Sequence, residues 1–255
     1  MRKTVLLAAL VTGLTLPTTV AAQGGPGFLF KNPRVSIGVR TGYQLPRVES
    51  DIFVFPLDSL TLDRSDFASP YLGGELAVRV ADRLDVAVGV GWARARSESE
   101  YVNWLEGDDP IAQVTTFQTV AGSLGAKYYF AERGRSIGRF AWVPSRVTPY
   151  LGGGIGVVGY EFEQAGDFVD YETVVTDPND GSVSADIFTD RLRTTGAGVL
   201  GYLAGGADVA LGKQFVLTAE ARYTLANGSV GGPFSGFDKI DLAGLQLLAG
   251  LALRW

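Results

Sequence analysis

The chain of 255 residues carries a formal net charge of −5 with 34 glycines and 11 prolines, a composition that suits one large β domain with many turns. Its acidic balance, without a basic patch interleaved with aromatic residues, argues against nucleic-acid binding. The chain has no cysteine and no histidine, which excludes disulfides and removes the commonest general base and transition-metal ligand. We therefore expect no cofactor and no metal site.

The first residues have the pattern of a secretory signal peptide. Arg2 and Lys3 form a basic start, residues 5–16 are mostly apolar, and Val20 and Ala22 stand at the −3 and −1 positions of a cleavage site. The apolar run is shorter than the roughly 20 residues that a membrane-spanning helix needs. We expect residues 1–22 to be cleaved and residues 23–255 to form one domain.

Period-two alternation of apolar and polar residues predicts about eight strands in that domain. Each is long enough to cross a bilayer when tilted, which takes roughly 9 to 11 residues, whereas strands of soluble sandwiches have about 5 to 6. The expected fold is all-β, a single closed antiparallel transmembrane β-barrel with long extracellular loops and shorter periplasmic turns. The expected strands are residues 34–43, 71–80, 84–92, 120–130, 147–162, 199–209, 215–225 and 245–255.

The last strand shows the alternation clearly. Every second residue from Leu245 to Trp255 is apolar, and Leu248 is the one large apolar residue on the opposite face. A terminal Trp in a membrane strand would lie in the aromatic girdle at the lipid interface. The facing of the glycine-rich fifth strand is ambiguous, and we favour Leu151, Ile155 and Val157 outward.

Charged residues fall on the face opposite the apolar stripe. The interior of an eight-stranded barrel is just filled by side chains, so these residues are candidates for ion pairs inside the lumen. An acid/base catalytic cluster is the other interpretation, but unpaired buried charges are costly and the chain lacks histidine, so we expect no catalytic residue. The lumen ion-pair candidates are Arg40, Glu75, Arg79, Lys127, Asp208, Glu220, Arg222 and Arg254.

The expected long connections, among them residues 94–114 and 163–190, carry most of the acidic residues. This predicts an acidic outer rim able to meet divalent cations or a surface partner. Residues 177–181, reading DPNDG, suit a tight turn better than a calcium loop. The apolar run at residues 52–57 has two interpretations, a strand extension above the membrane or an adhesive surface for a partner or apolar solute. We favour the strand extension.

With these features the chain resembles the small eight-stranded outer-membrane barrels, the OmpA-, OmpX- and OmpW-like families of Gram-negative envelopes. The resemblance rests on the signal peptide, the strand count, the stretches PYLGGGIGVVGY (149–160) and EARYTL (220–225), and the terminal aromatic. It implies a location in the outer membrane, in contact with its lipid, and periplasmic termini. It also implies that Trp255 acts as an interface anchor and as the assembly signal read by the barrel-assembly machinery.

The resemblance leaves two functions open. The first is a non-enzymatic structural or surface-interaction role, with a lumen largely plugged by charged side chains. The second is a narrow channel for small or apolar solutes. Enzymatic barrels of similar size depend on a histidine, which this chain lacks. We also expect no peptidoglycan-binding domain after the barrel.

Overall fold

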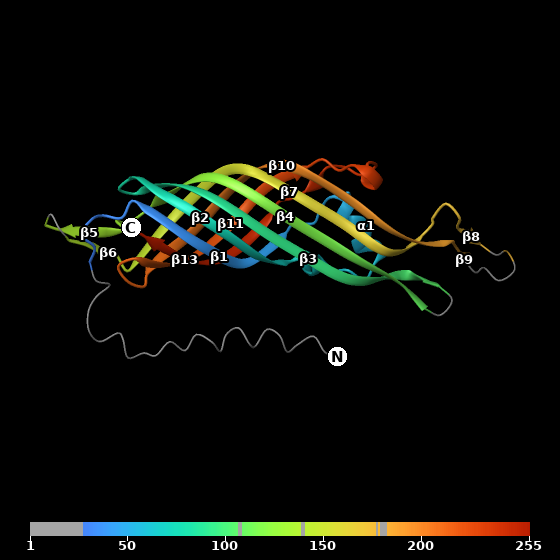
Figure 1. Ribbon diagram of the computed structural model, residues 1–255. Helices are drawn as coiled ribbons and strands as arrows, with labels where there is room; N and C mark the ends of the chain where they lie inside the picture. The colour runs from blue at the N-terminus through green and yellow to red at the C-terminus, as the bar shows by residue number, and fades with distance from the viewer. Residues whose placement is uncertain (1–27, 107–108, 139–140, 177, 179–182) are drawn as a thin grey trace.

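The computed structural model describes residues 28–255 except 107–108, 139–140, 177 and 179–182. Within these residues eight long antiparallel strands form a closed ring, in which each strand pairs with its neighbours and the last pairs with the first (Figure 1). This confirms the predicted fold class. The ring contains β1 (Val35–Pro46), β2 (Ser69–Ala81), β3 (Leu84–Glu106), β4 (Asp109–Tyr129), β7 (Val147–Val169), β10 (Ile187–Ala210), β11 (Phe215–Gly228) and β13 (Gly244–Arg254).

Pairing of β1 with β13 closes the barrel. Its register runs from Ser36 opposite Arg254 to Pro46 opposite Gly244. At the end of the ladder, the backbone N–H groups of Arg34 and Val35 donate to the carbonyl of Trp255 over 2.8 and 3.1 Å. No strand of the ring is left with an open edge, which is the condition for strands to cross a hydrocarbon layer.

The outer surface of the ring is an apolar belt between two groups of aromatic side chains. The terminal strand points Leu247, Leu251 and Trp255 outward, as predicted. Leu151, Ile155 and Val157 are more than half exposed on the outer face, which confirms the favoured facing of the glycine-rich strand. Exposed aromatic residues mark the two edges of the belt, Tyr128, Phe130, Phe215 and Trp255 at one end and Tyr43, Trp92 and Tyr223 at the other.

Four adjacent strands continue well beyond this belt. β3, β4, β7 and β10 have 23, 21, 23 and 24 residues, against 11 to 14 in the other four strands of the ring (Figure 1). The prediction of long loops over residues 94–114 and 163–190 is therefore wrong for most of their length. Many outward positions of these strands are charged, as in loops, but residues that alternate with them are buried on the inner face, among them Tyr101, Gln113, Phe117, Phe162 and Gln164.

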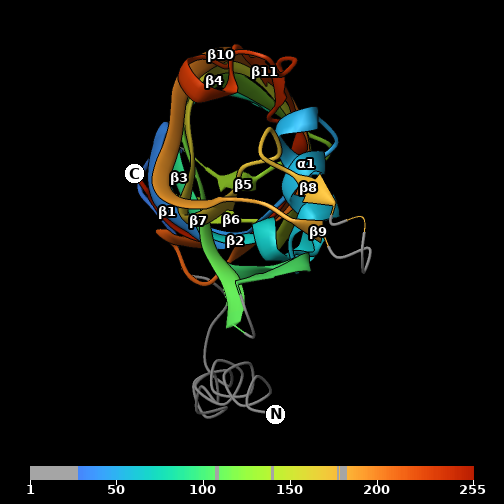
Figure 2. The same ribbon diagram turned by 90° about the vertical axis from the view of Figure 1, so that its right-hand side faces the viewer.

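The extracellular mouth is filled from within by the first and last long connections. The first contains α1 (Asp51–Ser59) and η2 (Arg64–Phe67), and the last contains η3 (Gly232–Phe234) and β12 (Ile240–Asp241), which pairs with β11. Figure 2 shows this end of the molecule facing the viewer, with α1 at the rim of the ring. No helix in the described part of the chain is long and apolar enough to span a membrane.

Helix α1 corrects the prediction of a strand extension at residues 52–57. Ile52, Phe53 and Pro56 are buried, whereas Val54 and Phe55 on the other side of the helix are partly exposed. The buried residues recur with helical rather than strand spacing because the helix turns one side inward to the mouth. Phe53 makes edge-to-face contacts with Phe67, Phe117 and Phe162, with ring centroids 5.1 to 5.6 Å apart. We call these four rings the mouth cluster.

Short elements complete the two ends of the barrel. At the periplasmic end, β5 (Gly134–Ile137) pairs with β6 (Ala141–Pro144), and Leu29 forms a bridge with Trp142 of this hairpin. Beyond the membrane on the other side, β8 (Val175–Thr176) pairs with β9 (Val183–Ser184).

Replacing Phe53 by alanine should destabilise the barrel by about 3 to 5 kcal/mol, the usual cost of removing a buried phenylalanine side chain. The measurement is the temperature at which the compact, fast-migrating form is lost on gels of unheated and heated samples. Val54→Ala, in the same helix with a side chain 38% exposed, is the matched control. An equal effect of the two changes would contradict a structural role for the mouth cluster.

Candidate functional site in the barrel lumen

The centre of the lumen holds five of the eight predicted charged residues, and their strands leave room for them. Arg40 on β1 stands opposite glycines on both neighbouring strands, Gly73 and Gly250. Glu75 on β2 likewise stands between Gly38 and Gly89. A methyl group added at Gly250 would lie 3.0 Å from the Cγ of Arg40. Glycines on the neighbouring strands therefore leave the space that these long charged side chains need in a narrow interior.

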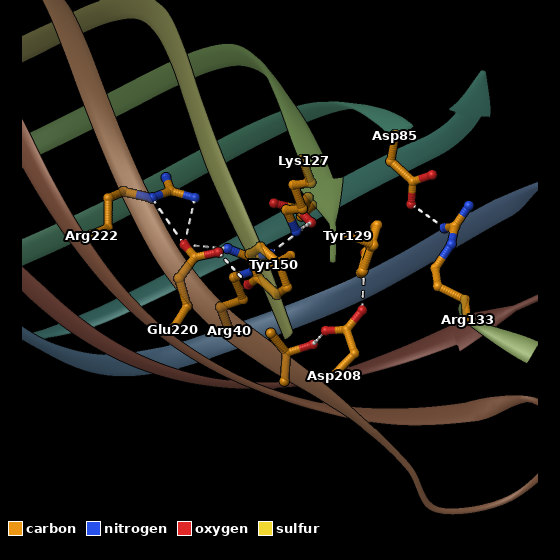
Figure 3. A network of polar contacts seen from close by, with 11 residues as sticks. Arg40, Asp85, Lys127, Tyr129, Arg133, Tyr150, Asp208, Glu220 and Arg222 are labelled. Carbon is orange, nitrogen blue, oxygen red and sulfur yellow. Dashed lines mark hydrogen bonds and ion pairs between the residues drawn. The ribbon is translucent and has the colours of Figure 1, made fainter. Parts of the chain in front are cut away.

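These residues form a chain of alternating charge across the lumen (Figure 3), which we call the lumen network: Lys127, Glu75, Arg40, Glu220 and Arg222. Arg40 lies 2.6 Å from Glu75 (Nη2 to Oε1) and 2.7 Å from Glu220 (Nη1 to Oε1). Arg222 contacts the same Glu220 oxygen over 2.9 Å from Nη2, and Lys127 contacts Glu75. Each carboxylate is thus held by two cations.

Tyrosines that the sequence patterns did not single out support the network. Tyr150 donates its hydroxyl to Glu220 Oε2 over 2.6 Å, which satisfies the second oxygen of a side chain that is 1% exposed. The guanidinium of Arg222 lies 4.3 Å from the centroid of the Tyr202 ring, and Lys127 lies 5.1 Å from that of Tyr150. Because Leu151 was predicted to face outward, the strand alternation could have predicted that its neighbour Tyr150 faces the lumen.

The other three predicted residues lie nearer the periplasmic end and outside this network. Asp208 accepts hydrogen bonds from Tyr129 (3.0 Å) and Thr218 (2.8 Å). Arg79 donates to the Asn32 side chain and to the Asp82 backbone. Arg254 donates to the backbone carbonyls of residues 212 and 213, and its guanidinium lies 5.1 Å from the Trp142 ring centroid.

An ion pair between Asp85 and Arg133 is a component that the sequence prediction missed (Figure 3). Asp85 faces inward on β3 and is buried. Arg133 belongs to the connection between β4 and β5, where strand alternation gives no information about side-chain direction. The pair therefore depends on how that connection folds back against the barrel.

On the extracellular side of the network the lumen becomes less charged. Gln246 donates to Gln44 over 3.1 Å, and Gln44 donates to Thr119 over 3.2 Å. A cavity of about 40 Å³ separates the network from the mouth and is lined by Arg222 and Gln246 among others. Leu248, the exception to the terminal alternation, packs in the lumen against Tyr71 and Ala93.

An ion pair outside the membrane ties the first and last long connections together. Arg47 Nε donates to Asp241 Oδ2 over 2.7 Å, and the Asp241 carboxylate raises the pKa of the arginine. The backbone N–H of Asp241 donates to the Ser50 hydroxyl, the residue before α1. The two segments that fill the mouth are thus held to each other.

Both carboxylates of the lumen network are engaged in ion pairs with cations. Among the described residues, no group of three or more acidic side chains is placed to hold a metal ion. The predicted signal peptide lies outside the described residues. So does most of the turn expected at residues 177–181.

No protein-family model matches the chain, and no curated protein is detectably similar to it in sequence. Solved structures with a similar fold include Neisserial surface protein A, at 16% identity over 91% of this chain and 100% of that one, with a TM-score of 0.42. OprG of Pseudomonas aeruginosa is 15% identical over 89% of this chain and 99% of that one, with a TM-score of 0.46. The outer-membrane protease OmpT of Escherichia coli is 10% identical over 89% of this chain and 98% of that one, with a TM-score of 0.38. These likenesses concern the fold alone.

A closed ring of strands with an apolar, aromatic-edged exterior and a charged interior is a transmembrane β-barrel, and such barrels are built into outer membranes. The chain folds as a small eight-stranded barrel of the type found in outer membranes, as its sequence predicted. Its end with the long connections is the extracellular one, and the end with the short turns is periplasmic.

Glu220→Gln removes one charge from the network without changing its shape, and it leaves Arg40 and Arg222 without their shared carboxylate. Breaking a buried ion pair costs about 3 to 5 kcal/mol, so the unfolding temperature in the gel assay should fall clearly. Combining it with Arg222→Gln should cost less than the sum of the two single changes. Glu98→Gln, on the exposed outer face of β3, is the control. Simple additivity would show that the network residues are energetically independent.

Proposed function

We propose that the protein is a non-enzymatic component of the outer membrane, with a structural or surface-interaction role and a lumen that does not conduct. The observation that carries the proposal is the lumen network. It lies across the middle of the barrel, and its members Arg40 and Glu220 have side chains only 8% and 1% exposed. Separating these charges for a passing solute would cost several kcal/mol.

The mouth supports the same proposal from the other side. The mouth cluster packs between α1 and the inner faces of β4 and β7, in a larger apolar core that also includes Phe234 of η3. The lumen is thus filled twice, once by ion pairs and once by aromatic rings. A solute would have to displace both.

A narrow channel is the second candidate, and the cavities on either side of the lumen network are the observation that favours it. Planar-bilayer recording of the refolded protein separates the two candidates. We expect no discrete openings, because the network and the mouth cluster close the lumen in series. Reproducible unitary openings would overturn the plugged lumen, and a change of their ion selectivity in Glu220→Gln would place the path through the network.

The surface-interaction role fits the outer wall of the four long strands. Arg94 and Arg96 are exposed on β3 and follow directly after the outward Trp92, where lipid headgroups lie. Among the described residues neither arginine forms an ion pair. On β10, Arg193 pairs with Glu161 over 2.6 Å at the exposed surface. Guanidinium groups bind phosphate in a bidentate manner, so we propose phosphorylated lipid headgroups as the partner of Arg94 and Arg96.

Exchanging Arg94 and Arg96 for glutamine should lower the bound fraction of a phosphorylated lipid several-fold. The measurement is native mass spectrometry of the detergent-solubilised protein with added diphosphoryl lipid A, and the same lipid without phosphate as a second probe. The matched control exchanges Arg135 and Arg146, which are exposed at the periplasmic end. Equal losses in both double variants would mean that only net charge matters.

A further inference from the structure

The periplasmic half of the lumen contains a cavity that the ion-pair network does not fill. It measures about 60 Å³ and lies between Arg40, Lys127, Asp208 and Trp142. This is more than the roughly 10 to 15 Å³ that one water-sized occupant needs. Arg34, which is exposed at the rim, also lines the cavity, so the space extends to the periplasmic surface. We call it the vestibule.

Positive charge dominates the walls of the vestibule. The charged residues that line it are five cations and two anions: Arg34, Arg40, Lys127, Arg133 and Arg254 against Glu75 and Asp208. Glu75 is shared by Arg40 and Lys127, and Asp208 accepts hydrogen bonds from two neutral hydroxyl groups. Arg254 has backbone carbonyls as acceptors and, among the described residues, no carboxylate within 4.0 Å.

Buried guanidinium groups at this end also keep donors without acceptors. Arg133 uses Nη1 for Asp85, whereas its Nε and Nη2 are buried and have no hydrogen-bond partner within the described part of the chain. The Nε of Arg79, which lies at the same end of the barrel but does not line the vestibule, is also buried without a partner in the described residues. A guanidinium has five N–H donors, and a buried donor without an acceptor destabilises the folded protein. The vestibule therefore combines an excess of cations with two unpaired donors on Arg133, beside which the Oδ1 of Asp85 is also buried without a partner among the described residues.

We propose that the vestibule is a binding site for one small inorganic anion of the size of chloride or phosphate, which enters from the periplasmic end. Such an ion supplies negative charge against the excess of cations and acceptors for the two unpaired donors of Arg133. It lies on the periplasmic side of the lumen network. Three residues of that network, Arg40, Glu75 and Lys127, line the site.

Trp142 makes the site measurable. Its side chain is 3% exposed, it lines the vestibule, and Arg254 lies over its ring. Iodide is an anion of suitable size that quenches tryptophan fluorescence, caesium is a cationic quencher, and acrylamide is a neutral one. The difference between the wild-type protein and Trp142→Phe isolates the emission of this residue from that of the other tryptophans.

In the refolded protein in non-ionic detergent, iodide should quench the Trp142 emission with a saturating dependence on concentration. Caesium and acrylamide should quench it weakly and without saturation. Chloride and phosphate should compete with iodide. Arg133→Gln should raise the half-saturating iodide concentration at least tenfold, and Arg135→Gln, in the same connection but exposed, should leave it unchanged. Linear quenching by iodide, or an equal response of the two variants, would overturn the proposal.

A second measurement covers the case in which Arg133→Gln fails to fold, because the change leaves Asp85 buried without its partner. The wild-type protein is unfolded by heat at constant ionic strength, with gluconate replaced stepwise by chloride or phosphate. Binding to the folded state raises the unfolding temperature in proportion to the logarithm of ligand concentration above the Kd. An unfolding temperature that is the same in gluconate, chloride and phosphate would exclude the site.

Discussion

The need to pair every backbone N–H and C=O group within a hydrocarbon layer is the constraint from which the rest of this structure follows. The pairing of β1 with β13 meets it by removing the last open edge. Closure gives the sheet an inside and an outside, and the side-chain period of two then assigns each residue to lipid or lumen. A shift of β1 by one residue in that register would turn Arg40 from the lumen to the lipid, so closure and lumen chemistry are not separable.

Closure with only eight strands leaves a narrow lumen, and the sequence of this protein fills it by pairing residues of unequal size. Glycines stand opposite long side chains on the neighbouring strands, as Gly73 and Gly250 stand opposite Arg40. The charged side chains can then reach across the centre and meet carboxylates from distant strands. The lumen network holds three cations and two carboxylates, so charge at the centre of the barrel is nearly balanced. The vestibule is lined by five cations and two carboxylates, so charge is positive toward the periplasmic end.

Strand alternation was enough to predict the membrane-spanning part from the sequence, because lipid and lumen impose a strict period of two there. The five network residues were predicted for the same reason. Above the membrane that rule weakens, since water on the outer wall accepts charged residues such as Arg94 and Glu98. The hairpins of β3 with β4 and β7 with β10 consequently looked like loops. Helix α1 and Arg133 were missed because their placement depends on packing between segments far apart in the chain.

The unequal strand lengths have a structural consequence for the cell surface. Four strands continue past the membrane while four stop near it, so the inner face of the longer half would be exposed to water above the shorter half. Apolar residues on that face, such as Phe117 and Phe162, would be costly to leave exposed. Helix α1 covers them with Phe53, and the pair of Arg47 with Asp241 holds its segment in place. The same packing that closes the mouth therefore gives the protruding wall a fixed shape, which is what the proposed surface-interaction role requires.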